Sequence, residues 1–197
     1  MLNKTLIAAS VVTVVATTAT SQTVNDVSVG FGSTNFGIAL EGEYTISPQV
    51  GVRGLLMGGL TLEDEFEVED ATVDGEAEFG GLAVIGDYYP LANAWRISGG
   101  IFISNTEITG DVNDEGLEYE GTVEFANPVA PMITTGFSTE VAPGWSVSGD
   151  IGVIFSSLEV SSDEDDPVVQ DDINELNSDL EDVPLFPFVA IGVSYAF

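Results

Sequence analysis

The last eleven residues of the chain, Pro187 to Phe197, alternate between two kinds of side chain. Beyond Phe188, one face of this extended segment carries only alanine, glycine and serine. The other face is uniformly apolar and consists of Val189, Ile191, Val193, Tyr195 and Phe197. Because lipid accepts the apolar face and a narrow interior accepts the small residues, the pattern predicts a strand of a transmembrane β-barrel.

The same period-two pattern recurs along the chain and predicts eight strands. Their expected ranges are 24–31, 35–46, 50–62, 76–89, 95–109, 122–140, 145–158 and 185–197. Tight turns rich in Pro, Gly, Asn or Ser lie on one side of the layout, at 47–49, 90–94 and 142–144. Long links lie on the other side, apart from a short link at 32–34. We therefore expect an all-β fold: a single eight-stranded antiparallel transmembrane β-barrel with long acidic extracellular loops and one short helix in the last loop.

The first 21 residues have the pattern of a signal peptide. Lys4 provides a positive start, and the apolar run 6–16 is too short to span a bilayer as a helix. A buried amino-terminal helix is the alternative, but valine and threonine dominate and the run has no polar face. We expect export, cleavage after Ala19 or Ser21, and a barrel domain at 22–197 located in the outer membrane.

The chain contains no cysteine and no histidine. This excludes Ser-His-Asp and Cys-His catalysis and the usual zinc sites. The barrel enzymes of outer membranes, such as lipases, acyltransferases and proteases, use a histidine that is missing here. We therefore expect neither an enzyme nor a cofactor.

Acidic residues outnumber basic ones by 33 to 3, which gives a net charge of −30. Most of the acids fall in three clusters, at 63–78, 111–124 and 159–182. Such a chain repels nucleic acid and anionic membrane surfaces, so small cations are the expected partners. Adaptation to high salt is the alternative explanation, since salt weakens the repulsion between like charges.

Extending the strand alternation places six charged residues inside the barrel: Glu41, Glu43, Arg53, Asp87, Arg96 and Asp150. Because an unpaired charge in a narrow barrel is costly, we predict a network in which each guanidinium meets two or more carboxylates. A gate or a selectivity ring is the alternative role for these residues. Four apolar residues are expected to fill much of the remaining interior: Leu55, Met57, Phe102 and Ile154.

Aromatic residues gather near the tight turns and the carboxyl terminus. Amphipathic rings prefer the membrane interface, so the pattern predicts a girdle on the periplasmic side. Its expected members are Tyr44, Tyr88, Tyr89, Trp95, Trp145 and Tyr195.

The last acidic cluster contains a helical pattern. Asp166 and Pro167 predict the N-cap and the first residue of a helix that ends before Pro184. Its apolar stripe, expected to pack on the barrel rim or over its mouth or to bind a partner, consists of Val169, Ile173, Leu176 and Leu180. The preceding acids lack the glycine turn and the ligand spacing of an EF-hand loop, so we expect diffuse cation binding there: Asp163, Glu164, Asp165 and Asp166.

Several segments carry a resemblance to a known group of proteins: Gly-Asp-Tyr-Tyr-Pro at 86–90, Trp-Arg-Ile-Ser-Gly-Gly at 95–100, and the segments 144–153 and 193–197. They resemble small eight-stranded outer-membrane proteins of Gram-negative bacteria, in a poorly characterised subgroup of the OmpW-like and OmpA-like barrels. The resemblance implies recognition by the barrel-insertion machinery through Val193, Tyr195 and Phe197. It implies no single activity, and the loops of this chain are more acidic than the resemblance leads one to expect.

Two functions fit this sequence. The first is a narrow channel or uptake protein for small, cationic solutes, with the acidic loops concentrating cations at its mouth. The second is a non-conducting structural or surface-interaction barrel, whose loops bridge divalent cations to lipopolysaccharide or to a partner.

Overall fold

The computed structural model describes residues 26–68, 71–114, 117–164 and 167–197. The predicted signal peptide lies outside the described residues. In chain order the elements are β1 (Val27–Thr34), β2 (Gly37–Ser47), β3 (Val50–Val68), β4 (Ala71–Tyr88), β5 (Trp95–Ser104), β6 (Glu107–Asp114), β7 (Leu117–Phe125), β8 (Val129–Ala142), β9 (Trp145–Ile154), β10 (Leu158–Ser162), α1 (Pro167–Glu181) and β11 (Phe186–Ala196).

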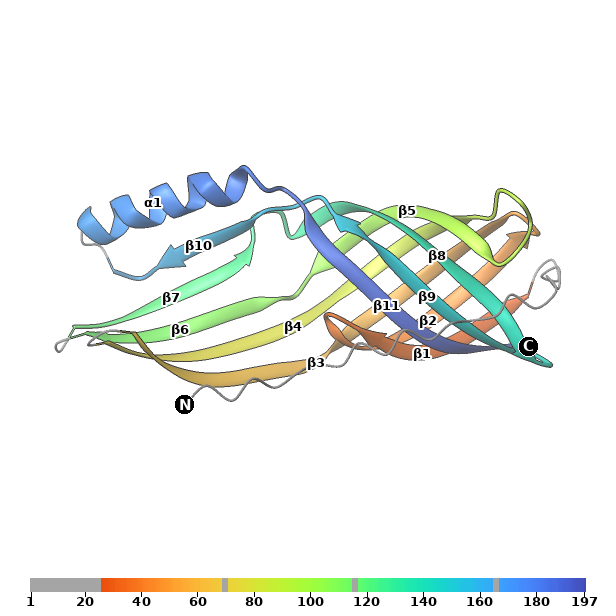
Figure 1. Cartoon of the computed structure of the whole chain (residues 1–197), viewed down its shortest axis with the longest axis horizontal. Coiled ribbons are helices and arrows are strands. Elements are labelled where there is room, and N and C mark those ends of the chain that lie inside the picture. Colours follow the sequence, from red (N-terminus) through yellow and green to blue (C-terminus); the bar gives the residue numbers. More distant parts are fainter. Residues whose placement is uncertain (1–25, 69–70, 115–116, 165–166) are drawn as a thin grey trace.

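Eight strands close into one antiparallel barrel (Figure 1). Strands β1 to β5 pair in order, β5 pairs with β8, β8 with β9, β9 with β11, and β11 returns to β1. The prediction of an eight-stranded antiparallel barrel with one short helix is confirmed. Closure pairs both edges of every strand in the ring, so the ring has no open edge.

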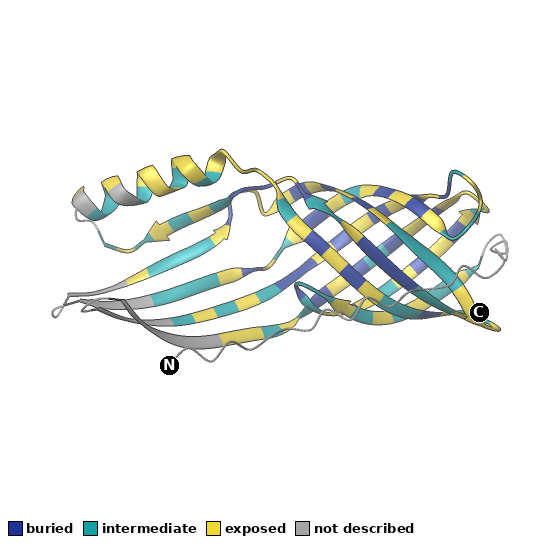
Figure 2. Ribbon diagram, viewed as in Figure 1, coloured by how far each residue is buried: buried dark blue, intermediate teal, exposed yellow. Residues whose placement is uncertain are grey.

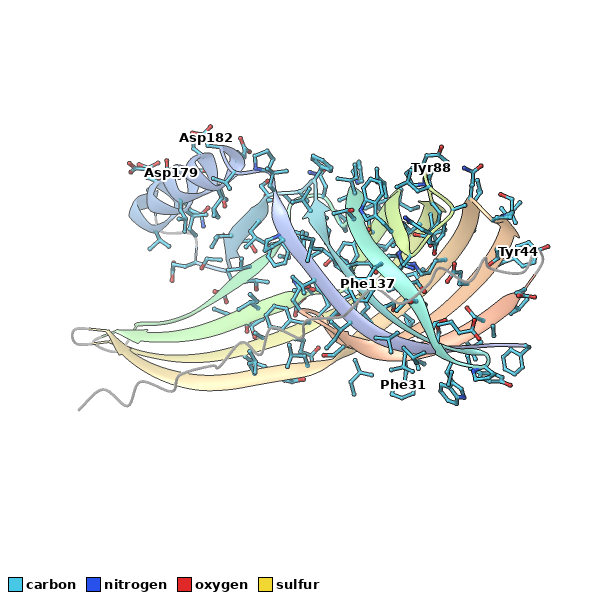
Figure 3. All side chains as sticks on the ribbon, turned by 45° about the vertical axis from the view of Figure 1, so that its right-hand side comes forward. Phe31, Tyr44, Tyr88, Phe137, Asp179 and Asp182 are labelled. Carbon is cyan, nitrogen blue, oxygen red and sulfur yellow. The ribbon has the colours of Figure 1, made fainter. Side chains whose placement is uncertain are left out.

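Burial alternates along the strands of the ring (Figure 2). In β5, for example, Arg96, Ser98 and Phe102 are buried, while Trp95 and Ile97 are exposed. The outward side chains are mostly large and apolar, and Figure 3 shows Phe31, Tyr44 and Tyr88 pointing away from the barrel. The core of the molecule is therefore the lumen of the barrel.

Five strands form a sheet that continues beyond the ring at one end, called the extension here: β3, β4, β6, β7 and β10. Strand β4 forms the fork, because residues 81–88 pair with β5 and residues 72–78 pair with β6. Thr106, between β5 and β6, is bonded to β4 at the fork. Its hydroxyl donates to the carbonyl of Gly80 at 3.1 Å and accepts from the Gly80 amide at 3.3 Å. The opposite end of the barrel, with the tight links and the carboxyl terminus, is called the turn end.

The extension corrects the expectation of long acidic loops. The predicted loops 63–78 and 111–124 lie mostly in strands, and 159–182 contains β10 and α1. The predicted strands 95–109 and 122–140 each divide in two, giving β5 and β6, then β7 and β8. The expectation was wrong because charge was taken to indicate a loop, although the period-two pattern continues through the acids, as in Glu65-Phe66-Glu67-Val68.

The link between β1 and β2 also differs from the prediction at 32–34. The turn is formed by Asn35 and Phe36, and Gly37 follows with a φ of 106°, which a glycine adopts easily. The Asn35 side chain donates to the carbonyl of Pro187 at 2.9 Å and accepts from the amide of Val189 at 3.0 Å. The turn is thereby fixed to β11, and the Phe36 ring is buried in the lumen.

The predicted helix is confirmed as α1, and it lies along β10 on the extension rather than over the barrel mouth (Figure 1). The side chain of Asn177 forms two hydrogen bonds with the backbone of Val160: its Nδ2 donates to the carbonyl at 2.9 Å, and its Oδ1 accepts from the N–H at 2.7 Å. Leu176, predicted to lie in the apolar stripe, is 46% exposed, and Asn177 faces β10 instead. The helix therefore covers the outer edge of β10. No helix among the described residues is long and apolar enough to cross a membrane.

Candidate functional site

Arg53 is at the centre of the lumen. Its Nε and Nη2 donate to the two oxygens of Asp87 at 3.1 Å each, and its Nη1 donates to Asp150 Oδ2 at 2.8 Å. Nη1 also reaches Glu41 Oε2 at 3.3 Å. Strands β3 and β9 lie on opposite sides of the eight-stranded ring, so the contact between Arg53 and Asp150 spans the lumen.

Arg96 forms the second half of the network. Its Nε and Nη2 donate to the two oxygens of Asp150 at 3.1 and 2.6 Å, a bidentate arrangement that fixes both groups. Its Nη1 donates to the Tyr89 hydroxyl at 3.3 Å. Asp87 is 3.9 Å from Arg96 Nε and accepts a short hydrogen bond from the Ser98 hydroxyl. Asp150 thus joins two arginines, while Asp87 depends mainly on Arg53.

Glu43 lies at the turn-end side of this network. It is 7% exposed, and the Tyr89 hydroxyl donates to its Oε1 at 3.4 Å. No arginine among the described residues lies within ion-pair distance of Glu43. The structure therefore brings Arg53, Arg96, Glu41, Asp87 and Asp150 into direct contact and links Glu43 to them through Tyr89.

An aromatic layer lies on the extension side of the charges. The Phe36 ring lies 4.8 Å from Phe102, 5.6 Å from Phe186 and 6.4 Å from Phe188, centre to centre. Phe125 approaches Phe186 at 4.9 Å. These rings come from the β1–β2 turn, β5, β11 and the end of β7, so they converge from different sides of the ring. Leu55, Met57, Phe102 and Ile154 are all buried in the lumen.

These two layers leave separate cavities. A cavity of about 370 Å³ opens at the turn end, where Glu43 and Tyr89 form part of its wall. A cavity of about 10 Å³, the size of one water molecule, lies beside Glu41 and Asp150. A third, of about 200 Å³, lies at the fork of the extension and is lined by Glu78, Glu107 and Glu124.

Of the six residues predicted for the girdle, five point outward and are at least 37% exposed: Tyr44, Tyr88, Trp95, Trp145 and Tyr195. The assignment of Tyr89 to the girdle is wrong, because Tyr89 is 2% exposed and donates to Glu43 inside the barrel. Neighbouring residues of a strand face opposite sides, so Tyr88 outside requires Tyr89 inside. The same rule, applied to Tyr89, would have added it to the predicted network.

The remaining predicted positions lie at the two ends of the molecule. Tyr195 and Phe197 are exposed at the turn end, and the Tyr195 ring contacts Trp145 and Phe197 at 5.2 Å each. In the acidic run before α1, Asp163 Oδ1 accepts from the Glu120 amide at 2.9 Å and Glu164 donates its amide to Ser162, while Asp165 and Asp166 lie outside the described residues. No group of three or more potential metal-ligating side chains occurs in the parts of the chain that the structure describes.

Sequence reasoning missed two features of the site. Phe36 was assigned to a strand rather than to the turn that directs it into the lumen. A row of four opposed glutamates across the extension was also missed, because the register of β6, β7 and β10 follows only from the strand pairing: Glu78↔Glu107, Glu107↔Glu124 and Glu124↔Glu159.

Comparisons with known proteins agree with the fold. No family model matches the sequence, and no curated protein sequence matches significantly. Among solved structures, the chain is similar to Acinetobacter baumannii CarO2, with 14% identity and a TM-score of 0.65 over 89% of this chain and 100% of that chain. It is also similar to A. baumannii CarO, with 15% identity and a TM-score of 0.61 over 90% of this chain and 100% of that chain. At this identity the likeness concerns the fold alone.

Proposed function

We propose that the chain is an outer-membrane barrel whose lumen is sealed and which acts at its outer surface. The support for a lipid environment is the outer face of the ring, where all eight strands expose large apolar side chains. A water-soluble monomer rarely exposes so large an apolar surface. The similarity to the CarO structures is consistent with this proposal. The five outward aromatics would then mark the periplasmic interface, and Val193, Tyr195 and Phe197 would be recognised by the barrel-insertion machinery.

The observation that carries the sealed-lumen proposal is the contact between Arg53 and Asp150. This 2.8 Å ion pair joins opposite walls of the barrel, and both side chains are at most 2% exposed. The phenylalanine layer closes the same lumen a second time toward the extension. A solute would have to separate a buried ion pair, which costs about 3–5 kcal/mol when one partner is lost, and then displace packed rings.

The extension supports a role at the cell surface. Glu78, Glu107, Glu124 and Glu159 oppose one another on four adjacent strands, and all four are exposed. Like charges directly opposite each other destabilise a sheet, so cations in solution would stabilise this one. Because no compact metal site is present among the described residues, we propose diffuse binding of divalent cations, which would bridge the extension to phosphates of lipopolysaccharide or to an acidic partner.

The test of the sealed lumen is single-channel conductance of the refolded protein in a planar bilayer under a KCl gradient. Gel mobility with and without heating establishes that the inserted protein is folded. We expect no discrete current steps. Steps with a cation-selective reversal potential would overturn the proposal and favour the second candidate, a narrow channel or uptake protein for small cations.

The observation that favours this second candidate is the cavity at the turn end, whose wall contains carboxylates and no basic side chain among the described residues. A channel would need the network to open. An Arg53→Ala or Arg96→Ala variant that gained conductance while keeping its stability would identify these arginines as a gate.

A test of the surface role compares the unmodified protein with a variant in which Glu78, Glu107, Glu124 and Glu159 are all replaced by glutamine. Vesicles containing lipopolysaccharide should bind the unmodified protein more tightly in Mg²⁺ than in EDTA. The variant should lose most of this difference, and an unchanged difference would refute the role of the glutamate row.

A further inference from the structure

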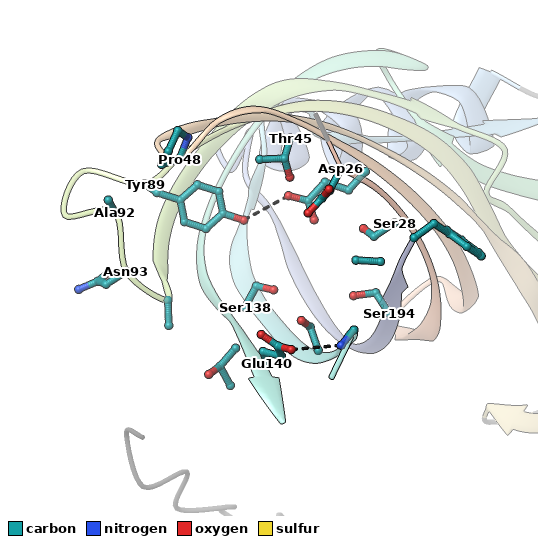
Figure 4. Close-up of a pocket in the computed structure, with 17 residues that line it drawn as sticks. Asp26, Ser28, Thr45, Pro48, Tyr89, Ala92, Asn93, Ser138, Glu140 and Ser194 are labelled. Atoms are coloured by element: carbon teal, nitrogen blue, oxygen red, sulfur yellow. Dashed lines mark hydrogen bonds between the residues drawn. The ribbon is translucent and has the colours of Figure 1, made fainter. Parts of the chain in front are cut away.

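The cavity at the turn end has a composition that suits one class of ligand. Its volume is about 370 Å³, within the range of small-molecule sites, roughly 300–1,000 Å³. Its wall combines hydroxyls such as Thr45, Ser138 and Ser194 with three side-chain carboxylates, and none of the described lining residues is basic. Figure 4 shows Asp26, Thr45 and Tyr89 on one side of this cavity and Ser138 and Glu140 on the other.

Glu43 is the carboxylate of the lumen that forms no ion pair with an arginine among the described residues. It is 7% exposed and receives one hydrogen bond, from Tyr89. The Tyr89 hydroxyl itself accepts from Arg96 Nη1 at 3.3 Å, so it stands between that guanidinium and Glu43. The lumen holds two arginines and four acids, Glu41, Glu43, Asp87 and Asp150, and the arginines contact the other three acids. Glu43 is therefore the acid of this group without an arginine within ion-pair distance, and it borders open space where a positive ligand would pair with its carboxylate.

We propose that this cavity binds the ammonium group of a small primary amine that has no carboxylate of its own, with Glu43 as the counter-charge. An ammonium has three protons to donate, and Glu43 with the neighbouring hydroxyls supplies acceptors. The alkyl part of the amine would occupy the remaining volume. A carboxylate on the ligand would be repelled by Asp26 and Glu140, so zwitterions are disfavoured.

A bare metal ion fits this cavity less well. Metal ions need several converging oxygen ligands, roughly six to eight for Ca²⁺. No group of three or more acidic side chains in the described part of the chain meets that need. An ammonium, by contrast, requires one opposite charge and a few hydroxyls, which this wall offers.

The inference is independent of conduction, since the cavity lies on the turn-end side of the charge network. The test is a titration of the refolded protein in zwitterionic micelles with n-butylammonium chloride. Binding is followed through the backbone amide NMR shifts of Thr45 and Ser194. Two matched probes are titrated separately: 4-aminobutanoate, which adds a carboxylate to the same amine, and KCl.

We expect saturable shifts with n-butylammonium and weaker, non-saturating shifts with the other two probes. Glu43→Gln should raise the dissociation constant roughly tenfold or more, because it removes a charge-assisted contact. The control Glu107→Gln removes the same charge from the extension and should leave binding unchanged. Ser138→Lys, which places a tethered ammonium in the cavity, should abolish saturation and serves in place of Glu43→Gln if that variant does not refold.

Three results would overturn the inference. Unaltered binding of n-butylammonium to the folded Glu43→Gln variant would show that Glu43 does not supply the counter-charge. Equally tight binding of 4-aminobutanoate would contradict the exclusion of zwitterions, and equal saturation by K⁺ would show that any monovalent cation suffices.

Discussion

Replacing Arg53 by methionine should destabilise the barrel more than the same change at Arg96. Methionine keeps most of the aliphatic volume, so the comparison isolates the guanidinium. Without Arg53, Asp87 keeps, among the described residues, the Ser98 hydroxyl and an Arg96 contact at 3.9 Å, and Glu41 loses the one ion pair that it forms with them. Without Arg96, Asp150 still contacts Arg53 at 2.8 Å.

The expected magnitude follows from those contacts. Leaving a buried carboxylate without its partner costs about 3–5 kcal/mol, and Asp87 is buried. We therefore expect Arg53→Met to lower the free energy of unfolding by about that amount, and Arg96→Met by about half of it. The double variant Arg53→Met with Asp87→Asn should recover part of the loss, since it removes the orphaned charge.

The assay is urea unfolding of the refolded protein in lipid vesicles, followed by the fluorescence of Trp95 and Trp145 and by gel mobility without heating. The control is Glu159→Gln, an exposed carboxylate on the extension, which should change little. The reasoning is refuted if Arg53→Met unfolds at the same urea concentration as the unmodified protein, or if Arg96→Met proves the more damaging change.

Three other variants test single contacts. Tyr89→Phe removes the hydroxyl between Arg96 and Glu43 and should lower the free energy of unfolding by about 1 kcal/mol in the same urea assay. No change would be expected if the Tyr89 hydroxyl lay outside the barrel, as in the girdle. Phe102→Ala opens a space in the aromatic layer and should cost about 3–5 kcal/mol; a loss below 1 kcal/mol would show that the layer is not packed. Asn177→Ala removes both hydrogen bonds to Val160, so limited proteolysis should cut the 158–183 region faster while the barrel keeps its gel mobility; an unchanged cleavage rate would show that these two hydrogen bonds do not hold α1 against β10.

The strand alternation alone was enough to predict the ring and the inward charges. Period two places Arg53, Arg96, Asp87 and Asp150 on one face without any knowledge of distance. Tyr89 was misplaced although the same rule applied, because its aromatic character was weighted above its position. Which carboxylate each arginine would contact was not predictable, since Arg53 and Asp150 lie 97 residues apart and meet only when the ring closes.

The extension was only partly predictable from the sequence. The period-two pattern runs through its acids, and the predicted strands 95–109 and 122–140 already contained Glu107 and Glu124. Like charges in register oppose strand pairing, however, so the local pattern does not indicate that these strands pair with each other. Its formation depends on β3 and β4 continuing from the barrel as a template, and on Asn177 covering the edge of β10. Both are tertiary effects that a local pattern does not contain. The Asn35 contact with β11 is a second case, joining residues 154 apart.

The barrel and the extension should differ in their response to salt because the basic residues lie only in the barrel. Once the predicted signal peptide is removed, Arg53 and Arg96 are the only basic residues, and both are buried in the lumen. The charges of the glutamates in the extension are therefore offset only by cations from solution. Screening over a Debye length of about 8 Å at physiological salt reduces the repulsion between these glutamates. Raising NaCl should slow proteolysis within the extension and leave the urea midpoint of the barrel nearly unchanged, because buried ion pairs are screened little. Two results would contradict this reasoning: a cleavage rate of the extension that does not depend on salt, or a urea midpoint of the barrel that changes markedly with salt. The first would show that the extension does not depend on screening by salt, and the second that the barrel does not depend on buried ion pairs.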